Sequence, residues 1–264
     1  MVRHRGAPRE DYRYPLMPQA SPRRTARVAG VLYFTSAVPA GFAVFVQLKL
    51  VVRDDAAATA ANILGSEALF RLGFVADLIG LMIFAGAVVM LYQLFIPVNK
   101  SLALLAAVLS FIGCAVQAVD SLADSGALLF LKGGTNLAAL AADQTQELAL
   151  VFLKLNSLSY TVALGFFGAS VVLFSILVVR STFLPRMIGV LWAIAGLGYW
   201  TFSVMAFVSP PFAAHLSPFI PFGTALGEAA AMAWFVAKSV NVQKWEQQAA
   251  AGERRPLLDA LGKN

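Results

Sequence analysis

The stretch MIGVLWAIAGLGYWTFSVMAFVSPPFAAHLSPFIPFGTALG, residues 187–227, contains 41 consecutive residues without Asp, Glu, Lys or Arg. A helix needs about 20 apolar residues to cross the roughly 30 Å hydrocarbon core of a bilayer, so this stretch is too long for one crossing. Prolines, which readily end a helix, gather in its middle at residues 209–221. The pattern therefore predicts two spans, near residues 187–208 and 218–237.

The remainder of the chain repeats this alternation of long apolar runs and short polar turns. Of its 264 residues 59% are apolar and 13% are charged, and its mean hydropathy is +0.74. These values exclude a disordered chain, a disulfide scaffold and an ordinary cytosolic enzyme. We therefore expect an all-α integral membrane protein with a bundle of six transmembrane helices. The other four expected spans are residues 28–48, 69–96, 101–125 and 147–179.

The distribution of basic residues predicts the orientation of this bundle. Residues 1–26 read as a disordered basic cytoplasmic tail, residues 27–240 as the six-helix transmembrane domain and residues 241–264 as a cytoplasmic C-terminal tail. With both termini cytoplasmic, 15 of the 20 Lys and Arg residues lie inside, as the positive-inside rule requires. We expect a multi-pass protein of the cell (inner or plasma) membrane, with anionic lipid rather than nucleic acid at the N-terminal tail.

The sequence contains few residues that could bind a metal or a cofactor. The single cysteine, Cys114, cannot form an internal disulfide or a cysteine-based zinc site, and the two histidines, His4 and His215, lie far apart. A Gly-rich phosphate loop is also missing. We therefore predict no metal, no cofactor and no catalytic residue.

Acidic residues within the expected spans lie toward the outer half of the bundle. A charge that faces lipid costs roughly 2.5–3.5 kcal/mol on insertion scales, so such side chains are expected to face one another. The sequence thus predicts an outward-opening polar cleft with ion pairs at its mouth, where Glu67 and Arg71 are spaced to pair on one helix face. The cleft would be lined by Asp77, Asp120, Asp124, Lys154 and Glu228, and its mouth by Glu67, Arg71 and Glu147.

Two other interpretations of these charges stay open at this point. They could be structural ion pairs, with Lys154 or Arg71 joined to an aspartate. Alternatively, Asp120, Asp124 and Glu147 could lie in water on a helix end that projects beyond the membrane.

Small residues on the last expected span suggest close helix packing. Gly223, Gly227 and Ala231 recur every four residues, which places them on one face of the helix. We expect this face to pack within the bundle rather than to form a dimer.

Three classes of function follow from this pattern. The leading one is a non-enzymatic membrane protein that binds, senses or passes a small solute, ion or lipid through the polar cleft. The second is an intramembrane enzyme that uses paired carboxylates, Asp77 with Asp120 or Glu228. The third is a structural or accessory subunit whose partner carries the chemistry.

Several blocks of the sequence also resemble a known family. They are RVAGVLYF (27–34), DDAAATAANILGSEALFRLGFVADLI (54–79), LYQLFIPVNKSLALL (91–105), FLPRMIGVLWAIAGLGY (183–199) and VNVQKW (240–245). Together they are similar to the bacterial multi-pass membrane family known as domain of unknown function 4386. The resemblance implies an uncharacterised prokaryotic inner-membrane protein and supplies no catalytic residues.

Overall fold

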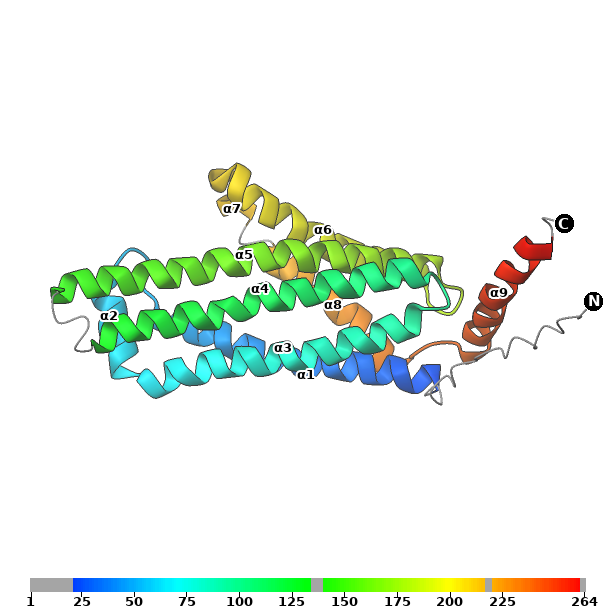
Figure 1. Cartoon of the computed structure of the whole chain (residues 1–264), viewed down its shortest axis with the longest axis horizontal. Coiled ribbons are helices and arrows are strands. Elements are labelled where there is room, and N and C mark those ends of the chain that lie inside the picture. Colours follow the sequence, from blue (N-terminus) through cyan, green and yellow to red (C-terminus); the bar gives the residue numbers. More distant parts are fainter. Residues whose placement is uncertain (1–20, 134–139, 217–219, 262–264) are drawn as a thin grey trace, which may run out of the picture.

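The computed structural model describes residues 21–133, 140–216 and 220–261, and all the regular structure in these ranges is helical. Figure 1 shows long, nearly parallel helices that form one elongated bundle. The helices are α1 (Pro22–Leu50), α2 (Ala56–Gly65), α3 (Glu67–Phe95), α4 (Lys100–Lys132), α5 (Ala142–Arg180), α6 (Arg186–Val208), α7 (Pro210–Leu216), α8 (Ile220–Ala237) and α9 (Val242–Leu261).

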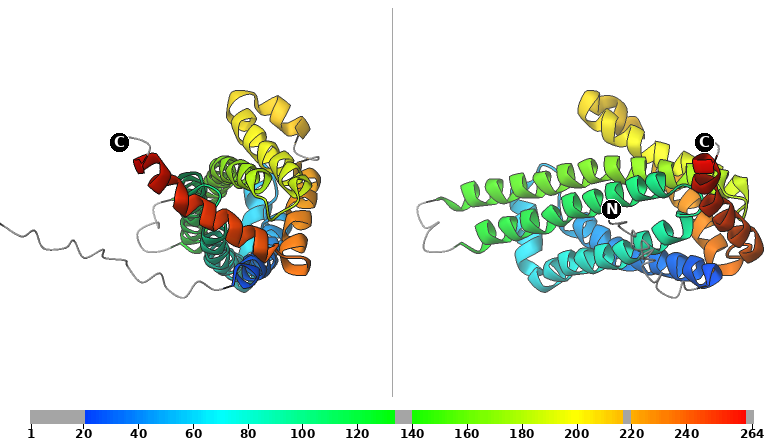
Figure 2. Two further views of the ribbon diagram at one scale, coloured as in Figure 1. Left: turned by 90° about the vertical axis from the view of Figure 1, so that its right-hand side faces the viewer. Right: turned by 45° about the vertical axis from the view of Figure 1, so that its right-hand side comes forward.

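Six of these helices form a closed ring. Around the ring, α1 packs on α3, α3 on α4, α4 on α5, α5 on α6, α6 on α8, and α8 returns to α1. The end-on view of Figure 2 shows this arrangement. The short helix α2 packs against α5 and α4 at one end of the ring, which we call the α2 end. We call the other end, where α1 and α6 begin and α8 finishes, the basic end.

Five helices of the described chain are long and apolar enough to cross a membrane: α1, α3, α4, α5 and α6. This confirms an all-helical protein with several candidate spans. The sixth predicted span corresponds to α8, which has 18 residues and closes the ring but is not among these five. Six crossings and the orientation of the termini therefore stay predictions.

The helices extend beyond several of the expected boundaries. The 39 residues of α5 rise by about 58 Å at about 1.5 Å per residue, so its outer turns and those of α4 project past the rest of the α2 end (Figure 1). At the basic end, α1 begins at Pro22, inside the region expected to be a disordered tail. Residues 1–20 lie outside the described residues. The expected C-terminal tail contains α9, anchored where the indole of Trp245 donates to the Leu94 carbonyl at 2.9 Å.

Local sequence explains where several helices begin and end. The side chain of Asp55 accepts a hydrogen bond from the backbone of Ala58 and caps α2, and Asn99 caps α4 in the same way through Leu102. Gly133 ends α4 with a positive φ of 62°, a conformation that glycine adopts without steric cost.

Apolar side chains fill both ends of the ring. At the basic end, the indole of Trp192 packs against Phe174 and Phe235, with ring centroids 6.0 and 6.1 Å apart. At the α2 end, Ile63 of α2 and Phe70 of α3 belong to a second buried cluster, together with Val46, Leu50, Ala127, Leu128, Ala149 and Leu153. Asp77 on α3, and Asp120 and Asp124 on α4, lie between these two clusters along their helices.

Glycine allows the backbones of α6 and α8 to approach each other closely. A Cβ atom on Gly227 of α8 would lie 2.5 Å from the carbonyl oxygen of Leu191 in α6, closer than any real Cβ contact. Ala231, one turn later, is fully buried. Gly223, the first member of the predicted stripe, meets nothing within 4 Å, so only the later part of the stripe packs. At Gly223, one turn before Gly227, α8 is therefore not in contact with α6.

This difference between two glycines of one helix generates a prediction. Gly227→Ala is expected to be less stable than Gly223→Ala by about 1–3 kcal/mol, because only the first substitution overpacks a helix contact. The gain in helix propensity is similar in both variants and cancels in the comparison. Thermal unfolding of the purified protein, followed by tryptophan fluorescence, measures the difference. Equal stabilities would show that α6 and α8 do not meet at Gly227.

Candidate polar site inside the helix ring

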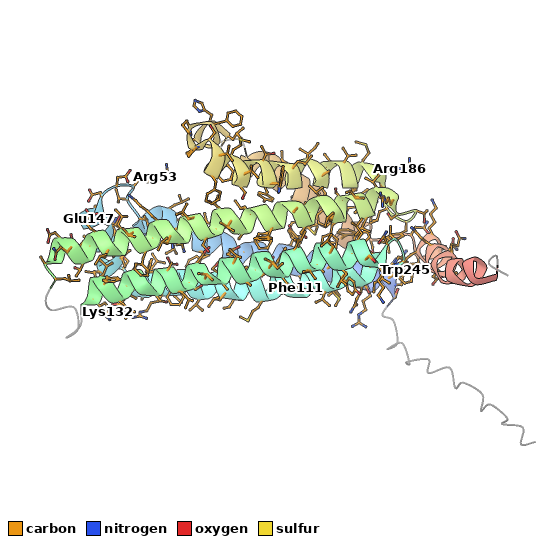
Figure 3. All side chains as sticks on the ribbon, turned by 45° about the horizontal axis from the view of Figure 1, so that its top comes forward. Arg53, Phe111, Lys132, Glu147, Arg186 and Trp245 are labelled. Atoms are coloured by element: carbon orange, nitrogen blue, oxygen red, sulfur yellow. The ribbon has the colours of Figure 1, made fainter. Side chains whose placement is uncertain are left out.

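Charged residues at the α2 end form ion pairs on the surface. The Nε atom of Arg71 lies 2.7 Å from Oε1 of Glu67, and Nζ of Lys132 lies 3.0 Å from the same oxygen. The pair expected from the spacing of Glu67 and Arg71 is therefore formed, with Lys132 as a third member. Glu147 is exposed nearby (Figure 3). Exposed pairs of this kind contribute little to stability.

Lys154 does not line the interior, contrary to the sequence-based expectation. Its Nζ atom lies 2.9 Å from Oδ1 of Asp54, and its side chain is 58% exposed. The physical reason is that α5 extends far past the ring, which brings Lys154 within reach of the loop before α2. There its ammonium group keeps its contact with water, which a place inside the ring would remove.

Asp124 lies inside the ring and accepts hydrogen bonds from two other helices. The amide of Gln47 in α1 donates to both of its carboxylate oxygens, at 3.0 and 3.1 Å. The amide of Asn156 in α5 donates to Oδ1 at 3.1 Å. Asp124 is only 4% exposed, which excludes the interpretation that it lies in water on a projecting helix end.

Asp120, one turn along α4, is equally buried but less completely hydrogen-bonded. It is 5% exposed, and its Oδ1 atom is buried without a hydrogen-bond partner among the described residues. The hydroxyl of Ser159 lies beside the carboxyl group, and Asp77 and Asp124 lie within electrostatic range of it. A buried polar atom with no partner is rare and calls for an explanation.

Asp77 and Glu228 face the same interior from the other helices. The amide of Gln117 in α4 donates to Oδ1 of Asp77 at 2.9 Å. The hydroxyl of Tyr33 in α1 donates to Oε1 of Glu228, and the hydroxyl of Tyr199 in α6 donates to Oε2 at 3.0 Å. Within the described residues, no hydrogen bond joins two of the carboxyl groups, which all face neutral amides or hydroxyls.

An apolar cluster lies on the side of the acidic residues where the sequence predicts the opening of a cleft. One turn from Asp124 toward the α2 end, Ala127 and Leu128 belong to the buried apolar cluster, and Leu153 stands in the same relation to Asn156. This cluster lies between the carboxyl groups and the α2 end. In the part of the chain that the structure describes, no group of three His, Cys, Asp or Glu side chains is arranged to hold a metal ion.

The donors of this site are the residues that sequence reasoning missed. Gln47, Asn156, Tyr33 and Tyr199 are neutral, so a search for charges passes over them. A usable signal exists for the two amides, because Gln and Asn are costly in an apolar span unless they are hydrogen-bonded. The tyrosines carry no such signal, since tyrosine is also common at membrane interfaces.

A closed ring of long apolar helices with carboxyl groups inside defines a multi-pass helical membrane protein. The chain belongs to the family described as Domain of unknown function (DUF4386), whose profile matches residues 28–239, and this confirms the resemblance seen in the sequence. Neither a curated protein nor a solved structure shows significant similarity to the chain.

The hydrogen bonds to Glu228 generate a second prediction. Tyr199→Phe removes a donor to a half-buried carboxyl group and keeps the aromatic side chain, and should lower the free energy of unfolding by about 1–2 kcal/mol. The matched control is Tyr160→Phe, because the Tyr160 hydroxyl makes no hydrogen bond within the described chain and its side chain is exposed. Thermal unfolding in detergent measures both variants. An equal loss in the two would mean that Glu228 does not depend on this donor.

Proposed function

We propose that the interior of the helix ring binds a small cation, a proton included, and that this binding is the basis of a sensing or carrier role. The observation that carries the proposal is the Oδ1 atom of Asp120, which is buried and has no hydrogen-bond partner among the described residues. Asp77 and Asp124 lie within electrostatic range of this carboxyl group. A cation at this position would offset both the missing partner and the mutual repulsion of the carboxylates.

The positions of the basic residues support the same proposal. Every lysine and arginine whose side chain the structure describes is exposed, so in that part of the chain no basic side chain enters the ring to neutralise the acids. The three ion pairs of the described residues all lie near the α2 end. Structural ion pairs therefore account for the surface charges but not for the interior ones.

Passage of a cation would require a path through the apolar ends of the ring. The α2-end cluster includes Ile63 of α2, a helix of 10 residues, so displacement of this short element would uncover the interior from that side. Binding and sensing need one such opening, whereas transport needs a second at the aromatic cluster around Trp192.

We also propose that the basic end faces the cytoplasm of a prokaryotic cell and that α8 is the sixth crossing. This orientation is supported by the bases of the basic end: Arg23, Arg24, Arg27, Lys100, Arg180, Arg186, Lys238 and Lys244. The sixth crossing is supported by the place of α8 in the ring, between α6 and α1. The N-terminal tail would then lie beside anionic lipid, as its arginines favour.

A structural role is the second candidate, and one observation favours it. Each hydrogen bond to an interior carboxylate oxygen joins two different helices of the ring, as between Gln47 of α1 and Asp124 of α4. In this reading, the carboxyl groups only hold the helices together, and the chain acts as an accessory subunit.

Charge removal at Asp120 separates the two functions. In the purified protein, a small cation or a lower pH is expected to raise the melting temperature of the wild type. Asp120→Asn should be more stable than the wild type by roughly 1–3 kcal/mol in the absence of the ligand, and should respond more weakly, because only Asp77, Asp124 and Glu228 then remain inside the ring. Melting curves in Na⁺, K⁺ or choline at constant ionic strength, repeated from pH 5 to 8, distinguish a metal ion from a proton.

Glu67→Gln is the matched control, because it removes the same charge from the exposed surface of the α2 end. It should keep the full response. A wild type that is insensitive to every cation and to pH would favour the structural role, and so would a response that is undiminished in Asp120→Asn.

A further inference from the structure

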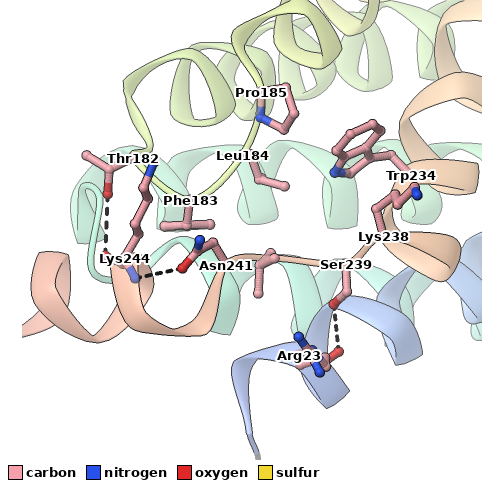
Figure 4. A pocket seen from close by; sticks show the side chains of 11 residues that line it. Arg23, Thr182, Phe183, Leu184, Pro185, Trp234, Lys238, Ser239, Asn241 and Lys244 are labelled. Atoms are coloured by element: carbon pink, nitrogen blue, oxygen red, sulfur yellow. Dashed lines mark hydrogen bonds between the residues drawn. The ribbon is translucent and has the colours of Figure 1, made fainter.

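A hollow at the basic end lies apart from the interior carboxyl groups. Its volume is about 470 Å³, and Figure 4 shows the residues that surround it. They come from the start of α1, the turn between α5 and α6, the end of α8 and the start of α9. The hollow thus lies where four segments distant in sequence meet at one end of the bundle.

The charges around the hollow have one sign. Arg23, Lys238 and Lys244 line it, and its lining contains no acidic residue. Within the described chain these three bases form no ion pair, in contrast to the lysines of the α2 end. Thr182, Ser239 and Asn241 add hydroxyl and amide groups to the same wall.

Hydrogen bonds hold the wall of the hollow in place. The hydroxyl of Ser239 donates to the carbonyl of Arg23 at 3.0 Å and joins the end of α8 to α1. The backbone N–H of Asn241 donates to the carbonyl of Phe183 at 3.2 Å and joins the start of α9 to the turn before α6. Ser239 has a positive φ of 59°, which turns the chain sharply between α8 and α9. The backbone segments that carry the three bases are therefore joined to the rest of the bundle by hydrogen bonds.

Two helix N-termini at the hollow add to the positive potential, whereas the C-terminus of α8 has the opposite sign. Asn241 and Pro185, which line the hollow, immediately precede the first turns of α9 and α6. The N-terminus of a helix carries a partial positive charge and favours anions. Trp234, partly buried, forms the apolar side of the hollow, as an aromatic residue does at a membrane interface.

We propose that this hollow binds the phosphate headgroup of an anionic phospholipid at the end of the bundle. The bases would contact the phosphate, the hydroxyl and amide groups the headgroup, and Trp234 the first part of the acyl chains. The lipid is favoured over free phosphate because the hollow lies where the apolar spans end and combines one apolar wall with three bases. This inference is independent of the proposed cation site.

The test compares two triple variants of equal charge in the full chain. Arg23→Gln/Lys238→Gln/Lys244→Gln removes the bases of the hollow, and Arg27→Gln/Lys100→Gln/Arg180→Gln removes three exposed bases elsewhere at the same end. Binding of phosphatidylglycerol to the detergent-solubilised protein is measured by native mass spectrometry and by the shift in melting temperature. Phosphatidylcholine and inorganic phosphate serve as the two other probes.

We expect the wild type to bind phosphatidylglycerol in preference to phosphatidylcholine. The first triple variant should bind it on the order of a hundredfold more weakly, about fivefold for each base, and the second less than tenfold more weakly. Equal losses in the two variants would overturn the proposal, as would full competition by inorganic phosphate. Should the triple variant fail to fold, Lys244→Gln against Lys100→Gln makes the same comparison, with about a fivefold loss expected only in the first.

Discussion

A carboxyl group inside a ring of apolar helices must find hydrogen-bond donors there, and the rest of the arrangement follows from this requirement. Asp124 receives its donors from α1 and α5, and Glu228 receives its donors from α1 and α6. With Asp77 joined to α4, these bonds connect all six helices of the ring. Lipid tails can replace the apolar contacts between helices, but they offer no hydrogen-bond donor to a carboxyl group.

The two apolar clusters make this polar interior possible. They fill the ring at both ends and keep the carboxyl groups away from bulk water, which would otherwise compete for every donor. Helices suit such a wall, because their backbone groups are satisfied internally. The α2 end takes part of its cluster from a short helix outside the ring, whereas the cluster of the basic end contains large aromatic side chains and residues of the turns between the helices.

Sequence patterns predicted the elements better than their partners. Length and hydropathy were enough for the five helices that could cross a membrane, and Asp120 and Asp124, which the sequence placed among the interior residues, are both buried on α4. Lys154 was wrongly placed because its direction depends on how far α5 extends, which local periodicity does not contain. The donor Gln47 lies 77 residues from Asp124, and only the order of helices around the ring brings the two together. Likewise, local sequence does not show that Gly227 contacts α6 and Gly223 does not, because this depends on the angle between the two helices.

Helices α1 and α8 contribute residues both to the interior carboxyl site and to the hollow at the basic end. Tyr33 and Arg23 are ten residues apart on α1, a rise of about 15 Å, and Lys238 directly follows the last residue of α8, the helix that carries Glu228. Between them, the two helices are in tight contact, since a Cβ atom on Gly30 would lie 2.8 Å from Cγ2 of Val236. Packed helices move as rigid elements rather than by continuous bending. A sliding of α8 along α1 would therefore change the distance from Tyr33 to Glu228 and the spacing of the bases around the hollow at the same time.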